Sequence, residues 1–166
     1  MKKINKKLLL IPLLVLLVFV TGCDNNTTTE EEAVKTMKHV VCTRQGEDTN
    51  LTASMKYDIY TSDGYIKILK SQEEVTSNSQ EVLDEYENAY RKIFKVYDSV
   101  EHYNTKVTRE DNKVIANIDI DYRKVDMDKI VQIENITDED NLVIHGKIKL
   151  SNWKKYMKKV GVTCDK

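Results

Sequence analysis

Residues 80–100 read QEVLDEYENAYRKIFKVYDSV, and this stretch decides the fold class. Its apolar residues recur at steps of three and four positions, which places them on one face of a helix: Val82, Leu83, Tyr86, Ala89, Tyr90, Ile93, Phe94 and Tyr97. Ser79, or Ser77 together with Gln80, is expected to cap the N-terminus. No glycine or proline interrupts the stretch. The pattern therefore predicts a long amphipathic helix whose apolar face packs against the rest of the domain.

The segments before this helix alternate between apolar and polar residues, as half-buried strands do. Residues 37–44 and 50–61 are expected to form a hairpin across residues 45–48. Ser62-Asp63-Gly64 has the composition of a tight turn, since Gly64 adopts positive φ without steric cost. Residues 65–70 are then expected to return as a third strand.

The segments after the helix predict more strands and two short helices. Residues 103–107 and 114–122 form an alternating hairpin pattern, and residues 142–150 predict a sixth strand. The short helices are expected at Asp126–Ile133 and in a last segment capped by Ser151 and ended at Gly161. The fold class is therefore α+β: an antiparallel sheet of five to six strands, with one long amphipathic helix packed on it and short C-terminal helices.

The first 22 residues have the features of a signal peptide. Four lysines precede the apolar residues 8–20, which only Pro12 interrupts and which are too few to span a bilayer. The next residues, Val20-Thr21-Gly22-Cys23, match a bacterial lipobox, in which diacylglycerol is attached to the cysteine and the leader is cleaved before it. We therefore expect lipidation at Cys23. An ordinary signal peptide with a chance cysteine and an uncleaved anchor are the alternatives.

The predicted signal peptide and lipobox divide the chain into three parts. Residues 1–22 are the lipoprotein signal peptide, residues 23–36 are the lipidated cysteine with a polar, flexible tether, and residues 37–166 are a single domain. Two acyl chains hold a protein durably, so the expected location is the outer, extracytoplasmic face of the cell membrane. Loss of the four leader lysines changes the formal net charge from −1 to −5, which disfavours nucleic acid as a partner.

Two cysteines remain after Cys23, namely Cys42 in the first expected strand and Cys164 near the C-terminus. Thiols of an exported domain are usually joined, so a Cys42–Cys164 disulfide is expected. Two separate buried thiols are the alternative. Their wide spacing excludes a redox motif of the Cys-x-x-Cys type.

The motifs of the chain predict no catalytic residue, no cofactor and no metal. The chain has no Gly-x-Ser-x-Gly elbow, no phosphate-binding glycine loop and no pair of metal ligands around its three histidines. Asn117, Asp119 and Asp121 share one strand face, with Asp126 and Asp128 beyond. These oxygen ligands suit a cation such as calcium, although the EF-hand pattern is absent. An outward polar face is the simpler interpretation.

Tyrosines on the helix allow two interpretations. Tyr86, Tyr90 and Tyr97 offer surfaces on which cell-wall sugars stack, but a stripe of this spacing more often belongs to a hydrophobic core. We therefore expect them in the core.

The chain resembles the small YehR-type bacterial lipoproteins, a family without an established activity. The resemblance rests on the lipobox and on three patterns in the domain: Val100–Tyr103 through Asn117–Tyr122, then Asp126–Ile130, and finally Trp153–Met157. It covers most of the mature domain. It implies an α+β lipoprotein fold and assigns no catalytic residues.

The expected function is a membrane-anchored extracytoplasmic lipoprotein with a noncatalytic binding or envelope-interaction domain. Its expected partners are the membrane, through the lipid on Cys23, and a protein or cell-wall ligand. The alternative is a metal-dependent module or enzyme that uses the acidic strand face around Asp119 and Asp121. Convergence of these carboxylates with Asp126 or Asp128 in one cleft would favour the alternative.

Overall fold

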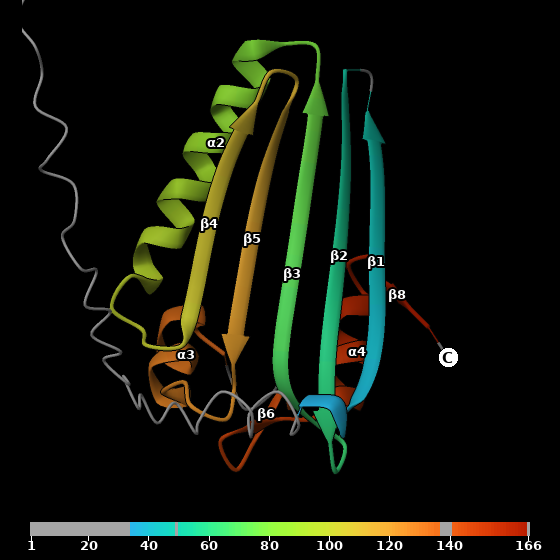
Figure 1. The fold of residues 1–166 in the computed structure, drawn as a ribbon, viewed down its shortest axis with the longest axis vertical. Coiled ribbons are helices and arrows are strands. Elements are labelled where there is room, and N and C mark those ends of the chain that lie inside the picture. The colour runs from blue at the N-terminus through green and yellow to red at the C-terminus, as the bar shows by residue number, and fades with distance from the viewer. Residues whose placement is uncertain (1–33, 49, 137–140, 166) are drawn as a thin grey trace, which may run out of the picture.

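A six-stranded antiparallel sheet forms the centre of the domain in the computed structural model, which describes residues 34–48, 50–136 and 141–165 (Figure 1). Its strands are β1 (Lys38–Asp48), β2 (Leu51–Ser62), β3 (Tyr65–Ser77), β4 (Tyr103–Glu110), β5 (Lys113–Asp121) and β8 (Thr163–Cys164). They lie in the order β4-β5-β3-β2-β1-β8, with every neighbouring pair antiparallel. The predicted antiparallel sheet is confirmed.

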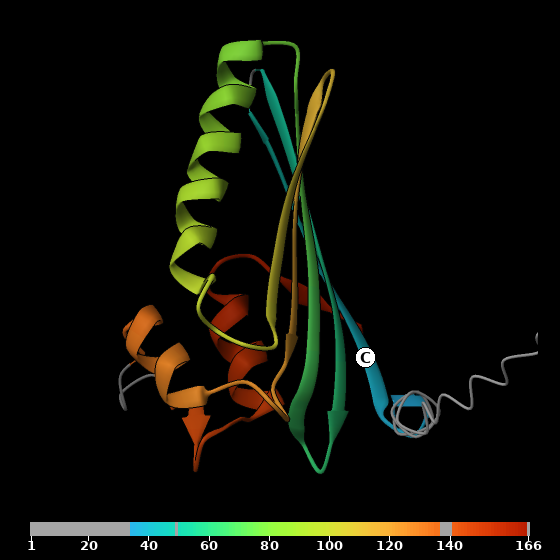
Figure 2. The same ribbon diagram turned by 60° about the vertical axis from the view of Figure 1, so that its left-hand side comes forward.

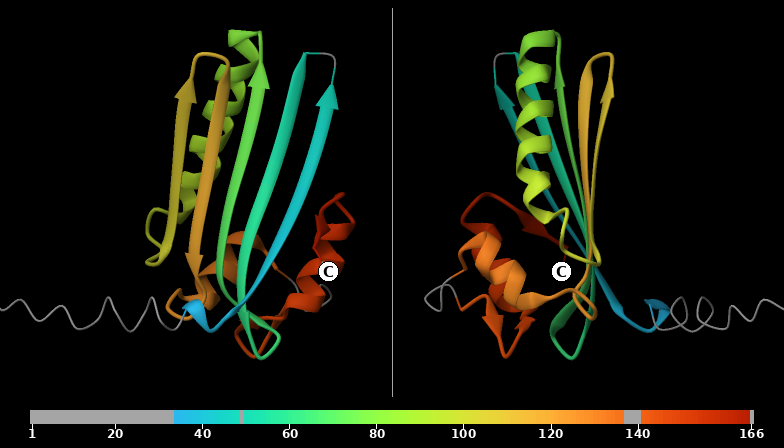
Figure 3. Two further views of the ribbon diagram at one scale, coloured as in Figure 1. Left: turned by 45° about the vertical axis from the view of Figure 1, so that its right-hand side comes forward. Right: turned by 90° about the vertical axis from the view of Figure 1, so that its left-hand side faces the viewer.

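The helices that follow β3 all lie on the same face of this sheet, and the opposite face, called the open face below, carries none of them (Figures 2 and 3). They are α2 (Gln80–Phe94), the short 3₁₀-helix η1 (Lys95–Tyr97), α3 (Met127–Glu134) and α4 (Leu150–Lys158). The predicted α+β class, with one long helix on the sheet and short C-terminal helices, is confirmed. None of the helices in the described segments is long and apolar enough to cross a membrane.

Helix α2 begins where the sequence predicts, because the Ser79 side chain accepts a hydrogen bond from the Val82 backbone N–H at 3.4 Å. It packs against β3, β4 and β5. One face of the helix closes a hydrophobic cluster with the sheet: Leu83, Tyr90 and Phe94 meet Val75, Val114 and Ala116. The helix ends at Phe94, earlier than the uninterrupted pattern predicts, and the chain continues as η1.

The first three strands form a continuous meander, and two of them are longer than predicted. The β1–β2 ladder runs as far as the pair Asp48–Leu51, so residues 45–48 belong to a strand and the predicted loop there is wrong. β3 extends to Ser77, past the predicted end at Lys70. In both segments polar residues continue the strand because the backbone ladder with β2 supplies their hydrogen bonds. Gly64 does adopt positive φ, at +79°.

The C-terminal part departs further from expectation. Residues 142–150 form no strand of the main sheet, because His145 and Gly146 both adopt positive φ and reverse the chain between β6 (Val143–Ile144) and β7 (Lys147–Ile148). The sixth strand is β8 instead, which pairs with β1. The predicted Ser151 cap is also wrong: α4 already begins at Leu150, and no side chain caps it. Gly161 follows the helix with φ +87°, as its predicted role requires.

A disulfide joins the two ends of the domain. Cys42 in β1 and Cys164 in β8 face each other across the sheet, and their sulfur atoms are 2.08 Å apart. Cys42 is buried in the larger hydrophobic cluster, which also contains Ile59, Ile130 and Trp153. The bond therefore fixes the short β8 strand to the core.

Candidate functional site

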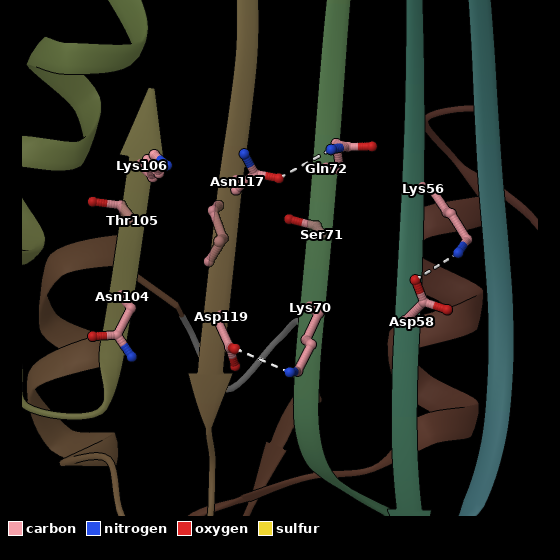
Figure 4. Close-up of a pocket in the computed structure, with 11 residues that line it drawn as sticks. Lys56, Asp58, Lys70, Ser71, Gln72, Asn104, Thr105, Lys106, Asn117 and Asp119 are labelled. Atoms are coloured by element: carbon pink, nitrogen blue, oxygen red, sulfur yellow. Dashed lines mark hydrogen bonds and ion pairs between the residues drawn. The ribbon is translucent and has the colours of Figure 1, made fainter. Parts of the chain in front are cut away.

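The open face of the sheet carries the acidic residues that the sequence singled out. The four residues Asp58, Lys70, Asp119 and Asn104 lie side by side across four strands (Figure 4). Lys70 forms an ion pair with Asp119 at 3.2 Å, and Lys56 forms one with Asp58 at 2.8 Å. Opposite charges alternate, so this face carries no strong charge of one sign.

The carboxylates around Asp119 do not converge. Asp121 pairs with Arg123 at 2.6 Å, and this pair holds the pKa of Asp121 below its usual range although partial burial acts to raise it. Asp126 caps α3 by accepting hydrogen bonds from the backbone N–H groups of Asp128 and Lys129. Among the described residues, no three Asp, Glu, His or Cys side chains are grouped so as to hold a metal ion. Asp119, Asp121 and Asp126 therefore each interact with a different local partner. This arrangement does not support the metal-dependent alternative.

A cleft on the covered face is the better candidate site. It has a volume of about 360 Å³ and lies between α2, α4 and the inner surface of β2, β3 and β5. Its walls are mostly aromatic or apolar, and two glutamates take part: Met55, Tyr57, Leu69, Tyr90, Ile93, Phe94, Tyr103, Ile118, Tyr122, Trp153, Met157, Glu73 and Glu134 are among the lining residues. An apolar cleft with a few polar groups is the usual form of a small-molecule site.

The first polar group of the cleft is the pair Glu73 and Tyr90. Glu73 comes from the inward phase of β3, between the buried residues Leu69 and Val75, and burial raises the pKa of its carboxyl. Burial, together with the nearby Glu73 charge, also raises the pKa of Tyr90. The Tyr90 hydroxyl is buried, and Glu73 is the polar group that acts on it, although no hydrogen bond of normal geometry joins them. Glu73 and Tyr90 thus form a desolvated polar pair in a mostly apolar wall.

The second polar group is Glu134 with three tyrosines. The Tyr97 hydroxyl donates a hydrogen bond to the Glu134 carboxylate at 3.3 Å, and the Tyr97 and Tyr103 rings stack at 4.1 Å. Glu134 is exposed as a residue, but its carboxyl end is shielded from water, which raises its pKa. Burial strongly raises the pKa of Tyr103 and Tyr122 as well, with Glu134 adding to both. These hydroxyls therefore stay protonated and able to donate hydrogen bonds at neutral pH.

The chemistry of the cleft suits binding. Its lining contains no histidine, cysteine or lysine, so no nucleophile stands beside a basic side chain of the types that usually activate it. What it offers is aromatic surface, carboxyl oxygens that accept hydrogen bonds and tyrosine hydroxyls that donate them. The arrangement fits a partly apolar molecule with polar groups at two positions.

The sequence predicted only a part of this site. Tyr90 was placed on the inward face of the helix, and it is indeed buried. The sequence did not predict Glu73 as a site residue, because β3 was expected to end at Lys70. In the longer strand, Glu73 alternates with Leu69 and Val75 on the inward face, and a glutamate at such a position indicates a buried carboxyl. Glu134 and Trp153 join the cleft only through the packing of α3 and α4, which no local pattern reveals. Lipidation of Cys23 falls outside the described residues.

Comparisons with known proteins place the fold. No family model and no curated protein sequence matches the chain. Among solved structures, the NMR structure of the YehR protein of E. coli has a TM-score of 0.54 at 16% identity, covering 78% of this chain and 92% of YehR. The NMR structure of a protein from Streptococcus pneumoniae TIGR4 has a TM-score of 0.51 at 16% identity, covering 78% and 86%. The resemblance to YehR-type proteins is thus confirmed at the level of the fold, and this chain has the α+β fold of YehR.

Proposed function

We propose that this chain is a lipid-anchored protein of the outer face of the cell membrane and that it binds a ligand in the cleft without chemical conversion. The observation that carries the binding function is the apolar cleft between α2, α4 and the sheet, with the carboxyl groups of Glu73 and Glu134 in its lining. The lipobox at Cys23 supports the anchor. The ligand class is a partly apolar envelope component or peptide that donates a hydrogen bond.

The anchor is tested by replacing the acceptor cysteine. In Cys23→Ala, the lipid attachment is lost, and the chain is expected to leave the detergent phase or to be mislocalised in fractionated cells. Thr27→Ala is the matched control, because it changes the same region of the chain and leaves the lipobox and the other two cysteines intact. Detergent-phase partitioning that Cys23→Ala leaves unchanged would contradict the anchor.

The cleft is tested by site-specific photocrosslinking in intact cells. Ile93 lines the cleft and is 55% exposed, whereas Val96 is 52% exposed and does not line it. A photoreactive residue at position 93 should capture material that position 96 does not. Tyr90→Phe, which removes only the hydroxyl, should lower the capture at position 93. Equal capture at both positions, unaffected by Tyr90→Phe, would contradict a ligand in the cleft.

Binding in solution has a built-in reporter. Trp153 is the only tryptophan of the chain, and it forms part of the cleft wall. Its fluorescence should respond when captured material, once identified, is titrated into the purified protein. Glu73→Gln should weaken the response if the ligand donates a hydrogen bond to the carboxylate.

A further inference from the structure

The last helix and the residues around it carry a concentration of positive charge in an otherwise acidic domain. Six lysines lie between residues 147 and 165, and the only acidic residue in that interval is Asp165. We call the outward part of this segment the α4 lysine surface, formed by Lys155, Lys158 and Lys159. These side chains are exposed, on the side of α4 opposite the buried Trp153.

The lysines of this surface differ from other lysines of the domain because they form no ion pair with a described carboxylate. Lys56, Lys70 and Lys113 elsewhere in the domain all form ion pairs with carboxylates. In contrast, the structure shows no carboxylate within ion-pair distance of any lysine of the α4 lysine surface among the residues it describes. A cluster of unpaired like charges is unfavourable by itself, so an anionic partner would relieve it.

Apolar side chains accompany the charge. Tyr156 and Val160 are large, exposed residues, at 41% and 45%, and they lie next to the lysines in the sequence. Lys159 also rests over the Tyr156 ring, with its Nζ 5.8 Å from the ring centre. Lysines beside an exposed aromatic residue are typical of helices that lie at the surface of a membrane.

The tether is long enough for the α4 lysine surface to reach the membrane. Helix α4 starts beside the β2–β3 turn, since the Leu150 backbone N–H donates to the Gly64 carbonyl at 3.0 Å. β1 starts at the same end of the sheet, because Lys38 pairs with Thr61. The chain between Cys23 and Val34 spans at most about 40 Å when extended. A lipid on Cys23 would thus keep this end of the domain, where α4 starts, within reach of the bilayer.

We propose that the α4 lysine surface docks onto the anionic phospholipid headgroups of the membrane. The membrane as its partner rests on the proposed lipid anchor, whereas the affinity for anionic lipid is a property of the domain alone. Docking would orient the domain on the membrane. The polar open face of the sheet would then not contact the membrane.

The test is vesicle sedimentation with residues 34–166, which contain both hydrophobic clusters and both cysteines of the disulfide. This segment should bind vesicles of phosphatidylcholine with 30% phosphatidylglycerol, and not vesicles of phosphatidylcholine alone. A lysine near such a surface contributes about fivefold in affinity. The triple variant Lys155→Gln, Lys158→Gln and Lys159→Gln should therefore bind on the order of 100-fold more weakly.

A matched control removes the same charge elsewhere. Lys92, Lys106 and Lys129 are exposed, lie on three different elements and form no ion pair that the structure shows among the described residues. Their replacement by glutamine should weaken binding far less. Circular dichroism checks that both triple variants fold. Equal effects of the two triple variants, equal binding to both kinds of vesicle, or no binding to the anionic vesicles at low salt would overturn the proposal.

These outcomes are distinguishable from failure of the proposed function. The segment used in the vesicle assay carries no lipid, so a negative result there leaves the anchor at Cys23 and the cleft untouched. A negative result for Cys23→Ala in cells would remove the anchor but would not alter the affinity of the isolated domain for anionic lipid.

Discussion

The disulfide between Cys42 and Cys164 is expected to supply a large share of the stability of the domain. The bond closes a loop with a sequence separation of 122 residues. In the chain-entropy model, a loop of this length stabilises the folded state by about 5 kcal/mol, because it restricts the unfolded chain. Single domains have total free energies of unfolding of about 5 to 15 kcal/mol. Loss of the bond should thus bring the domain close to the limit of stability.

The perturbation is the double variant Cys42→Ala and Cys164→Ala, compared with the oxidised protein in urea. With a slope of about 2 kcal/mol per molar urea, the unfolding midpoint should fall by about 2.5 M. Chemically reduced wild type is the control, because it loses the bond and keeps both sulfur atoms in the core. It should unfold at nearly the same urea concentration as the double variant.

A local effect should accompany the global one. β8 consists of two residues, and only the pairs Cys42–Cys164 and Thr43–Thr163 hold it to β1. Without the bond, the amide of Asp165, which donates to the Val41 carbonyl, should exchange its hydrogen faster than amides in β2. The reasoning is refuted if the midpoint changes by less than about 0.5 M, or if alkylation without reductant finds two free thiols.

Three other predictions test the core, the cleft and the metal question. Leu83 is fully buried, so Leu83→Ala should lower the free energy of unfolding by about 2–5 kcal/mol in urea, whereas Ile93→Ala at an exposed position should change it little. Because burial raises the pKa of Glu73 in the folded state, the contribution of Glu73 to stability should be fully present below the pKa of an unfolded glutamate and should be lost as the pH rises through the folded value. Glu73→Gln should therefore be more stable than wild type at pH 7 and show a flatter profile, and an unchanged profile would contradict the burial of this carboxyl. Calcium or zinc should shift the melting temperature little relative to chelator, since a site holding metal at one hundred times its dissociation constant would add about 2.7 kcal/mol; a gain of that size, lost in Asp119→Asn with Asp121→Asn, would revive the metal-dependent alternative.

The elements with a local pattern could be predicted from the amino-acid sequence. Helix α2 follows from steps of three and four apolar residues and from the Ser79 cap, and the β4–β5 hairpin follows from alternation. These are properties of neighbouring residues, which the chain carries wherever it folds. The same local patterns were misleading at residues 142–150, where alternation suggested a strand and the positive φ of His145 and Gly146 produced a turn.

The location of the candidate site depends on contacts between residues that are distant in the sequence. Asp119 and Asp121 looked like a cluster in the sequence, but pairing with Lys70 and Arg123 separates their roles. The cleft could not be read at all, because Glu73, Tyr90 and Trp153 come from three elements that meet only when α2 and α4 pack on the same face of the sheet. Desolvation of a carboxyl depends on atoms that are distant in sequence. For that reason the alternation of a strand predicts which of its residues are buried, whereas the pKa and the partners of each side chain depend on the folded structure.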